Sequence, residues 1–330
     1  MDDYFGRLNY FNYLKYFFKY IFFQKIDMEQ NWNKNLLLFL LCTIVHASIY
    51  WIYTKNPIKM KVAICTMAKK ENLYIKEFVD YYIKLGFSHI FIYDNNDPND
   101  EKISDVINIK KYKDYVTIYE NKSITNQPTA YTTCYNNNNK NFNWIFMIDI
   151  DEYLIIKNNT LINYLSDETF QKCDFIKIHW LQPTDNNKLH YENKPLLERF
   201  KAPYLKDTHI KTFVRGNING LKYDIHTPSA SPEKNISCNN AGQILNYPKI
   251  HVQDVFKINY DKAYIIHFKY KSTEEYIKKY KRGYSWENKS FLSMRISEYL
   301  KDNNVTLEKI LYFEKELNLN LSRYKMKKKK

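Results

Sequence analysis

The apolar positions change their period several times between residues 61 and 120. A nearly continuous apolar run predicts a buried strand, and the next segment has apolar residues three or four positions apart, as on one face of a helix. Gly86 predicts the end of that helix. The predicted elements follow in this order: strand 61–67, helix 72–86, strand 88–97, helix 101–112 and strand 115–120. Strands that alternate with helices predict an α/β fold with a mostly parallel central sheet and flanking helices.

Residues 144–154, WIFMIDIDEYL, continue this alternation after a helix that Pro128 begins. An apolar strand leads directly into Asp149, Asp151 and Glu152. Residues two apart in a strand face the same way, so we expect Asp149 and Asp151 to project together. Adjacent carboxylates repel unless a cation lies between them, and Mg²⁺ uses such oxygen ligands together with substrate phosphates. The pair therefore indicates a diphosphate bound through Mn²⁺ or Mg²⁺. A solvated strand end is the alternative.

Polar residues also gather where the other predicted strands end. In open α/β sheets, ligands bind outside the carboxyl ends of the strands. The residues at these ends are Thr66, Asp94, Asn95, Asp149 and Asp151. We expect them to surround one site, although Asp94 could instead cap a turn, as aspartate does well.

The N-terminal part of the chain has a different composition. Residues 1–34 form an aromatic-rich tail, which is either a helix lying on a membrane or a poorly ordered segment. Residues 36–53 carry no formal charge, and 18 residues at about 1.5 Å each nearly span the roughly 30 Å of a bilayer core. We therefore expect an N-terminal hydrophobic helix at 35–55 that acts as a single-pass membrane anchor. A buried helix is the alternative, and lysines at both ends leave the orientation open.

The charge of the chain limits the choice of partner. Lys and Arg outnumber Asp and Glu by 50 to 36, a net charge of +14, which favours an anionic partner. Only six of these cations are arginines, and arginine supplies the forked contacts that read base edges. We therefore expect no specific nucleic acid partner, and we assign much of the lysine excess to a solvated surface.

The five cysteines carry no recognisable motif. They stand at positions 42, 65, 134, 173 and 238, and none are spaced as metal ligands or as a C-x-x-C pair. Cys65 falls in a predicted strand, where a free thiol packs as a small apolar group. The sequence neither requires a disulfide nor excludes one.

Several stretches together resemble the glycosyltransferases of family 92 and the related family 2 group called Glyco_tranf_2_4, which share the GT-A fold. The segments that carry the resemblance are KKEN (69–72), EFVDYYIKLGFSHIFIYDNND (77–97), WIFMIDIDEYL (144–154), HWLQPTDNN (179–187), LLERF (196–200), KTFVR (211–215), DIHTP (224–228) and HFKYKSTEEYIKKYKRG (267–283). The first cluster departs slightly from the family order. The resemblance implies a Rossmann-like GT-A domain at 59–285, followed by C-terminal helices and a basic tail at 286–330.

The resemblance also implies roles for individual residues. Asp149 and Asp151 match the metal and diphosphate motif, and His267 matches a histidine that returns to the metal. Thr66 and Asp94 match positions that hold the nucleotide, and Glu71 would help to close that pocket; Asn95, at the same strand end as Asp94, is a further candidate for binding it. Candidates for contacts to the diphosphate or the acceptor are Arg199, Lys211, Lys271 and Arg282.

We therefore expect a metal-dependent, membrane-anchored glycosyltransferase of the hexosyltransferase type. It would move a sugar from a nucleotide-sugar donor, such as a UDP-sugar, to a hydroxyl of a glycan or glycoconjugate, with inversion. Inversion requires a general base, for which Asp185 is the candidate and Glu152 the alternative. Two other functions remain open: a metal-dependent nucleotidyltransferase, and a non-catalytic membrane-tethered binding protein on a transferase scaffold. In a eukaryote the anchor would place the chain in the Golgi or endoplasmic reticulum.

Overall fold

The structure is a computed structural model. It describes residues 60–120, 126–230, 235–245, 258–282 and 289–321, together with residues 41, 43 and 44. The chain divides into two compact units, Met1–Lys59 and Met60–Lys330, and only the second is described at length. The predicted tail at 1–34 and nearly all of the predicted anchor at 35–55 lie outside the described residues. Among the residues that are described, no helix is long and apolar enough to cross a membrane.

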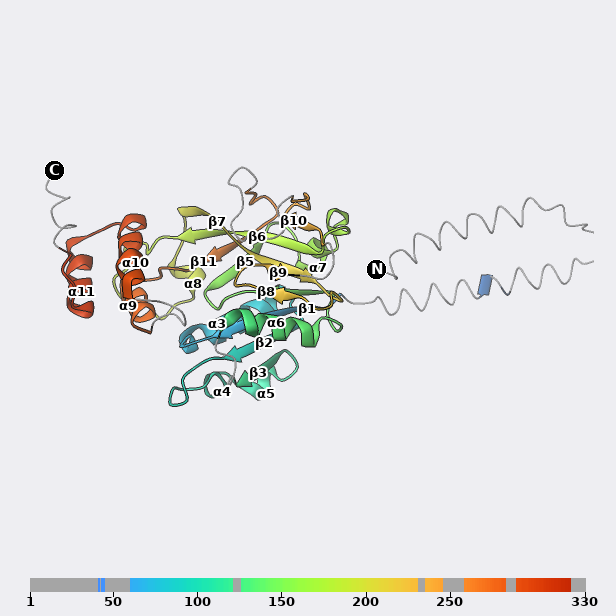
Figure 1. Cartoon of the computed structure of the whole chain (residues 1–330), viewed down its shortest axis with the longest axis horizontal. Coiled ribbons are helices and arrows are strands. Elements are labelled where there is room, and N and C mark those ends of the chain that lie inside the picture. Colours follow the sequence, from blue (N-terminus) through green and yellow to red (C-terminus); the bar gives the residue numbers. More distant parts are fainter. Residues whose placement is uncertain are drawn as a thin grey trace, which may run out of the picture. The chain divides into compact units, whose positions relative to one another are not determined.

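A large mixed sheet forms the centre of the second unit (Figure 1). Its strands are β1 (Val62–Ala68), β2 (His89–Asp94), β3 (Val116–Glu120), β4 (Trp144–Met147), β5 (Glu152–Ile156), β6 (Phe175–Pro183), β7 (Tyr204–Arg215), β10 (Ser237–Asn239) and β11 (Ala263–His267). They lie in the order β3-β2-β1-β4-β7-β6-β11-β5, with β10 beside β6. A separate pair is formed by β8 (Lys222–Tyr223) and β9 (Pro228–Ala230).

The prediction of a mostly parallel sheet is wrong. Strands β1 to β4 pair in parallel, as expected for β-α-β units. However, β7 pairs antiparallel with both β4 and β6, and β5 pairs antiparallel with β11. The sequence beyond residue 154 lacks the regular strand–helix alternation from which the parallel sheet was inferred, so the second half of the sheet is mixed.

The helices lie on both faces of the sheet and at one end of the unit. They are α3 (Asn72–Leu85), α4 (Ile103–Val106), α5 (Ile109–Tyr112), α6 (Gln127–Asn138), α7 (Leu161–Leu165), the 3₁₀ turn η1 (Glu168–Phe170), α8 (Leu196–Arg199), α9 (Thr273–Arg282), α10 (Lys289–Asp302) and α11 (Leu307–Leu317). As predicted, α3 ends at Gly86, whose φ of 108° is left-handed, and Pro128 lies in the first turn of α6. The helix predicted at 101–112 is split into α4 and α5.

Alternation along β1 explains the layers. Val62 and Ile64 point into an apolar core that also contains Phe78 of α3. Ala63 and Cys65 point into a second core that contains Tyr131 of α6. Because successive side chains of a strand face opposite sides, α3 and α6 cover opposite faces of the sheet.

A third core holds the C-terminal helices together. Tyr276 of α9, Tyr299 of α10 and Phe313 of α11 pack against one another, with ring centroids 4.5–6.4 Å apart. These helices lie at one end of the unit (Figure 1). The cluster fixes α9, whose polar side reaches the site described below.

The described part of the structure contains two disulfides, which the cysteine positions in the sequence had neither required nor excluded. Cys65 of β1 is bonded to Cys134 of α6, and Cys173 is bonded to Cys238 of β10. The expectation that Cys65 packs as a free thiol is therefore wrong. Each bond closes a loop of more than 60 residues and ties the sheet to a segment that packs beside it.

Candidate active site

The acidic segment after β4 is a turn and not the continuous strand that the sequence predicted. β4 ends at Met147, and β5 begins at Glu152. The backbone N–H of Glu152 donates to the carbonyl of Asp149, and the N–H of Asp149 donates to Glu152 Oε2. β5 then leaves β4 and pairs with β11. Strand alternation thus does not place Asp149 and Asp151; the turn does.

Both aspartates line a cavity of about 500 Å³. From the first half of the sheet and its helices come residues at the end of β1, after β1, β2 and β4, or on α6: Met67, Lys69, Glu71, Asn95, Gln127, Asp149, Ile150 and Asp151. From the second half and the C-terminal helices come Trp180, Gln182, Asp207, His209, Asp224, His226, His267, Lys279 and Arg282, among others. The cavity therefore lies where the parallel and the mixed halves of the sheet meet.

Asp149 is held from three sides. One oxygen accepts from the Lys211 ammonium at 2.9 Å, and the other accepts from the Tyr131 hydroxyl at 2.6 Å and from the Gln127 amide. Burial alone would raise the pKa of Asp149, but the charge of Lys211 and these hydrogen bonds hold it below its usual value. Asp149 is therefore an ionised carboxylate at neutral pH.

Asp151 is paired with a lysine and lies close to a histidine. Its Oδ2 accepts from the Lys279 ammonium at 2.6 Å, and its Oδ1 lies 3.7 Å from His267 Nε2. Burial opposes its ionisation, but the charge of Lys279 lowers the pKa of Asp151. Burial also lowers the pKa of His267 to about 3, so its imidazole is neutral at pH 7. Its ring packs against Trp180, with centroids 4.2 Å apart.

This donor set fits a divalent cation that also binds substrate. Ligands that each lie about 2.1 Å from one ion are at most about 4.2 Å apart, so Asp151 and His267 can share an ion. His267 Nδ1 is buried without a hydrogen-bond partner among the described residues. No three His, Cys, Asp or Glu side chains of the described part form a group that could hold a metal alone. Asp151 and His267 could therefore supply two ligands to Mn²⁺ or Mg²⁺, with substrate oxygens and waters as the others.

A second group of charges lies beside β1. Arg282 donates to Glu71 Oε1 and to the Lys69 carbonyl, both at 2.6 Å. The buried Lys271 lies 3.4 Å from Glu71 and has its ammonium over the Tyr74 ring. Arg282 and Glu71 line the cavity, together with Asn95 beyond β2. These contacts join the end of α9 to the start of α3.

Comparisons with known proteins identify the family of this chain. The profile of glycosyltransferase family 92 matches residues 59–307. The chain belongs to glycosyltransferase family 92. Family 92 proteins of Oryza sativa subsp. japonica and Arabidopsis thaliana are 30% and 28% identical to it, over 99 and 100 residues. These matches cover 30% of this chain and 17% of each relative. The kinship expected with the family 2 group stays a prediction.

Two residues predicted to bind the nucleotide, Asp94 and Thr66, do not line the cavity of this family 92 chain. Asp94 caps the turn after β2: its two oxygens accept from the backbone N–H groups of Asn96 and Ile103. Thr66 is fully buried in β1 and does not line the cavity. Neighbouring positions take their place, because the side chains that reach the cavity there are Met67 and Asn95.

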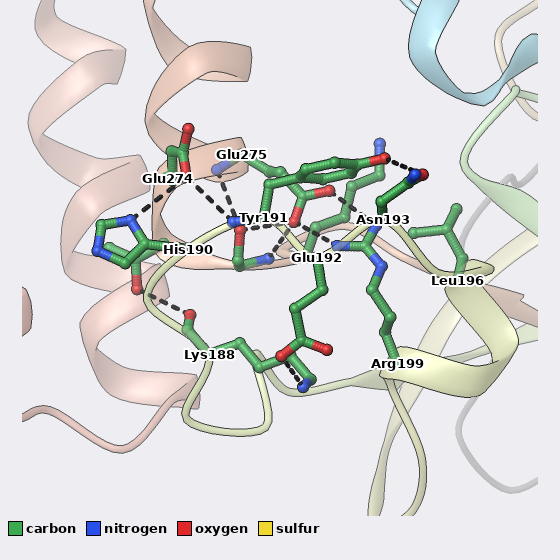
Figure 2. Close-up of polar contacts among 12 residues, drawn as sticks. Lys188, His190, Tyr191, Glu192, Asn193, Leu196, Arg199, Glu274 and Glu275 are labelled. Atoms are coloured by element: carbon green, nitrogen blue, oxygen red, sulfur yellow. Dashed lines mark hydrogen bonds and ion pairs between the residues drawn. The ribbon is translucent and has the colours of Figure 1, made fainter.

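Arg199 and Asp185 also lie away from the cavity. Arg199 points at Glu275 of α9 and forms two parallel hydrogen bonds of 2.8 and 2.9 Å, and both side chains are buried (Figure 2). Asp185 is buried and accepts from Tyr299 at 2.5 Å and from Lys309 at 2.6 Å. Arg199 and Asp185 thus contact the C-terminal helices and do not line the cavity; their roles in diphosphate binding and proton transfer stay predictions.

Glu152, the alternative general base, is fully buried behind the turn. Burial raises the pKa of Glu152 well above its usual value, although the Lys211 ammonium 3.8 Å away opposes this shift. Glu152 does not line the cavity. Glu152 therefore shapes the turn that carries Asp149 and is not placed to accept a proton from a substrate.

Sequence reasoning missed several residues of the site. Tyr131 and Gln127 of α6 orient Asp149, Lys279 of α9 pairs with Asp151, and Asp207 and His209 of β7 form a further pair. Pro128 marked the start of α6 but not which face it turns to the site. Lys279 stands in the run KKYKR, where nothing distinguishes it from its solvated neighbours.

Proposed function

We propose that this chain transfers a glycosyl group from a nucleotide-sugar donor to a hydroxyl of a glycan or glycoconjugate. The supporting observation is the turn after β4, where Asp149, Asp151 and a neutral His267 line one cavity and each aspartate is paired with a lysine. Membership of family 92 supports the reaction class. UDP-sugars are the donors, Mn²⁺ or Mg²⁺ is the cofactor, and the transfer inverts the anomeric centre.

The residues divide into two functions. Those that follow β1 and β2 lie outside the carboxyl ends of parallel strands, where nucleotides bind in such sheets, so Lys69, Asn95 and Glu71 face the nucleoside. Asp149, Asp151 and His267 hold the metal, which screens the negative charge of the diphosphate as the glycosidic bond breaks. Lys279 and Arg282 add positive charge where the leaving group develops its own.

A donor screen tests this function. The full chain is incubated with UDP- and GDP-sugars plus Mn²⁺ or Mg²⁺, and release of nucleoside diphosphate is measured. We expect release from a UDP-sugar that EDTA abolishes and that Asp151→Asn reduces by at least roughly 100-fold. The matched control is Asp261→Asn, because Asp261 is an exposed aspartate outside the cavity. Release of pyrophosphate from a nucleoside triphosphate and a sugar phosphate would instead indicate a nucleotidyltransferase.

We also propose that residues 36–53 anchor the chain in a membrane of the secretory pathway. The support is the uncharged sequence and the two disulfides, which persist in oxidising compartments. Fractionation tests it: the chain should stay in the membrane pellet after alkaline carbonate extraction, and a variant lacking residues 1–56 should not. Extraction of the full chain would contradict the anchor.

A further inference from the structure

A histidine and an aspartate on β7 form a close pair at the edge of the cavity. Asp207 Oδ1 lies 2.6 Å from His209 Nδ1 and accepts from the His209 backbone N–H at 2.8 Å. The Gln182 amide donates to the other oxygen of Asp207. The indole of Trp180 stacks on the His209 imidazole with 18° between the planes and 5.1 Å between centroids. The imidazole is thus fixed both in its plane and in its rotation.

The local strand pairing turns this pair toward the cavity. The register between β6 and β7 shifts between His179 and Leu181, whose partners are Ile210 and Lys206. The intervening segment of β7 is therefore longer than its counterpart on β6, an irregularity that redirects side chains next to sites. Asp207 and His209 both line the cavity, and Lys211, which holds Asp149, follows on the same strand.

We infer that His209 is the general base that takes the proton from the acceptor hydroxyl, and that Asp207 is its positioning residue. This inference rests on the proposed inverting transfer from a nucleotide sugar. Asp207 binds Nδ1, which leaves Nε2 as the nitrogen that faces the acceptor. An aspartate that holds the imidazole in one tautomer and stabilises the imidazolium is a recurrent device in proton transfer.

The acceptor hydroxyl gives its proton to Nε2 of His209, while its oxygen forms a bond to the anomeric carbon of the donor. The bond between that carbon and the diphosphate oxygen breaks, and the electron pair leaves with the nucleoside diphosphate. The imidazolium then returns its proton to solvent, which is accessible because about 40% of the His209 side chain is exposed.

Other bases that line the cavity are less suited. Burial lowers the pKa of His226 to about 3, so its imidazole is a weak base, and His267 is already assigned to the metal. Asp151 and Glu71 are paired with Lys279 and Arg282. Asp224, whose Oδ1 accepts from the backbone N–H of Ile225, is the rival that an experiment must separate from His209.

The test compares His209→Gln, Asp207→Asn and Asp224→Asn in the full chain, with the UDP-sugar that supports UDP release by the wild type. The matched control is His190→Gln, because His190 lies 3.4 Å from Glu274 in a similar pair outside the cavity (Figure 2). We expect kcat to fall about 100- to 10,000-fold in His209→Gln, the range that general bases contribute. Asp207→Asn should lower kcat roughly 10-fold or more with an unchanged KM for the donor.

Two further measurements separate the base from a structural role. UDP with Mn²⁺ should raise the melting temperature of each variant as it does that of the wild type, because the donor side is intact. Added imidazole should restore part of the turnover of His209→Ala and none of that of Asp151→Asn. Full activity of His209→Gln, or a loss in Asp224→Asn alone, would overturn the assignment and leave the transferase function standing. A wild type that releases no UDP from any donor would overturn both.

Discussion

The buried pair between Arg199 and Glu275 yields a stability prediction that separates two roles for Arg199. Its guanidinium is about 1% exposed and the Glu275 carboxylate about 2%. The perturbation is Arg199→Met, which keeps an apolar stem of similar length and removes only the charge and the donors. If Arg199 holds α9, the protein should lose stability; if it binds diphosphate, as the sequence suggested, the protein should lose donor affinity.

The magnitude follows from the contacts that are lost and those that remain. Two hydrogen bonds to a charged group are removed, each worth about 1.5–3 kcal/mol. Glu275 keeps three donors: the Ser272 hydroxyl at 2.5 Å, the Ser272 N–H at 3.0 Å and the Tyr74 hydroxyl at 2.5 Å. Breaking one side of a buried pair usually destabilises by about 3–5 kcal/mol, and the remaining donors place this case near 3 kcal/mol.

The assay is urea unfolding followed by circular dichroism, with the midpoint and the slope compared between variants. The control is Lys278→Met on the same helix, where the ammonium is 68% exposed and pairs with Glu274 at 2.7 Å. An exposed i,i+4 pair contributes only about 0.3–0.5 kcal/mol. Equal losses in Arg199→Met and Lys278→Met would refute the reasoning, and a raised donor KM without loss of stability would restore the diphosphate role.

Three further predictions concern a disulfide, pH and a lysine of the site. Cys173→Ser with Cys238→Ser opens a loop of 65 residues and should lower the free energy of unfolding by up to about 4 kcal/mol; dithiothreitol should destabilise this variant less than the wild type, because only Cys65–Cys134 is left to reduce. His226 is neutral in the folded state because burial lowers its pKa to about 3, whereas the unfolded chain binds the proton near pH 6.5. The unfolded state thus holds more protons as pH falls, and stability should drop between pH 6.5 and 5 by at most about 1.4 kcal/mol per unit; urea unfolding of His226→Gln should show a shallower slope. Lys279→Met should weaken binding of UDP with Mn²⁺ about 10- to 100-fold by calorimetry while Mn²⁺ alone binds no more weakly, and Lys278→Met should change neither.

The first half of the fold was predictable because each of its strands and helices has a local pattern of apolar residues that indicates its type. The strand at 61–67, the helix at 72–86 and the strand at 115–120 are all found, within two residues of their ends. The mixed half of the sheet was not predictable. Strands β6, β7 and β11 are brought together by long-range pairing, which the local pattern of apolar residues does not indicate. The turn at Asp149 was missed for the same reason, since β5 leaves its neighbour to pair with β11.

The acidic residues of the candidate site could be predicted from the sequence more readily than its lysines and arginines. Asp149 and Asp151 stand out because acids follow an apolar strand, which is a local signal. Lysines are so frequent in this chain that their positions carry little information, and only the packing of α9 selects Lys279 from its neighbours. Arg199 became a candidate through the resemblance to family 92, yet its burial beside Glu275 depends on a helix 76 residues further along the chain.

The ion pairs in the cavity suggest how a charged donor could enter without leaving buried charges unpaired. Asp149 is paired with Lys211, Asp151 with Lys279 and Glu71 with Arg282. Leaving any of these carboxylates without a cation would be unfavourable in so buried a site. If a metal ion arrives with a diphosphate, the carboxylates can turn to the metal while the released cations turn to the phosphoryl oxygens. The exchange conserves charge pairing on both sides, so metal and donor should bind cooperatively, and each should bind more weakly alone.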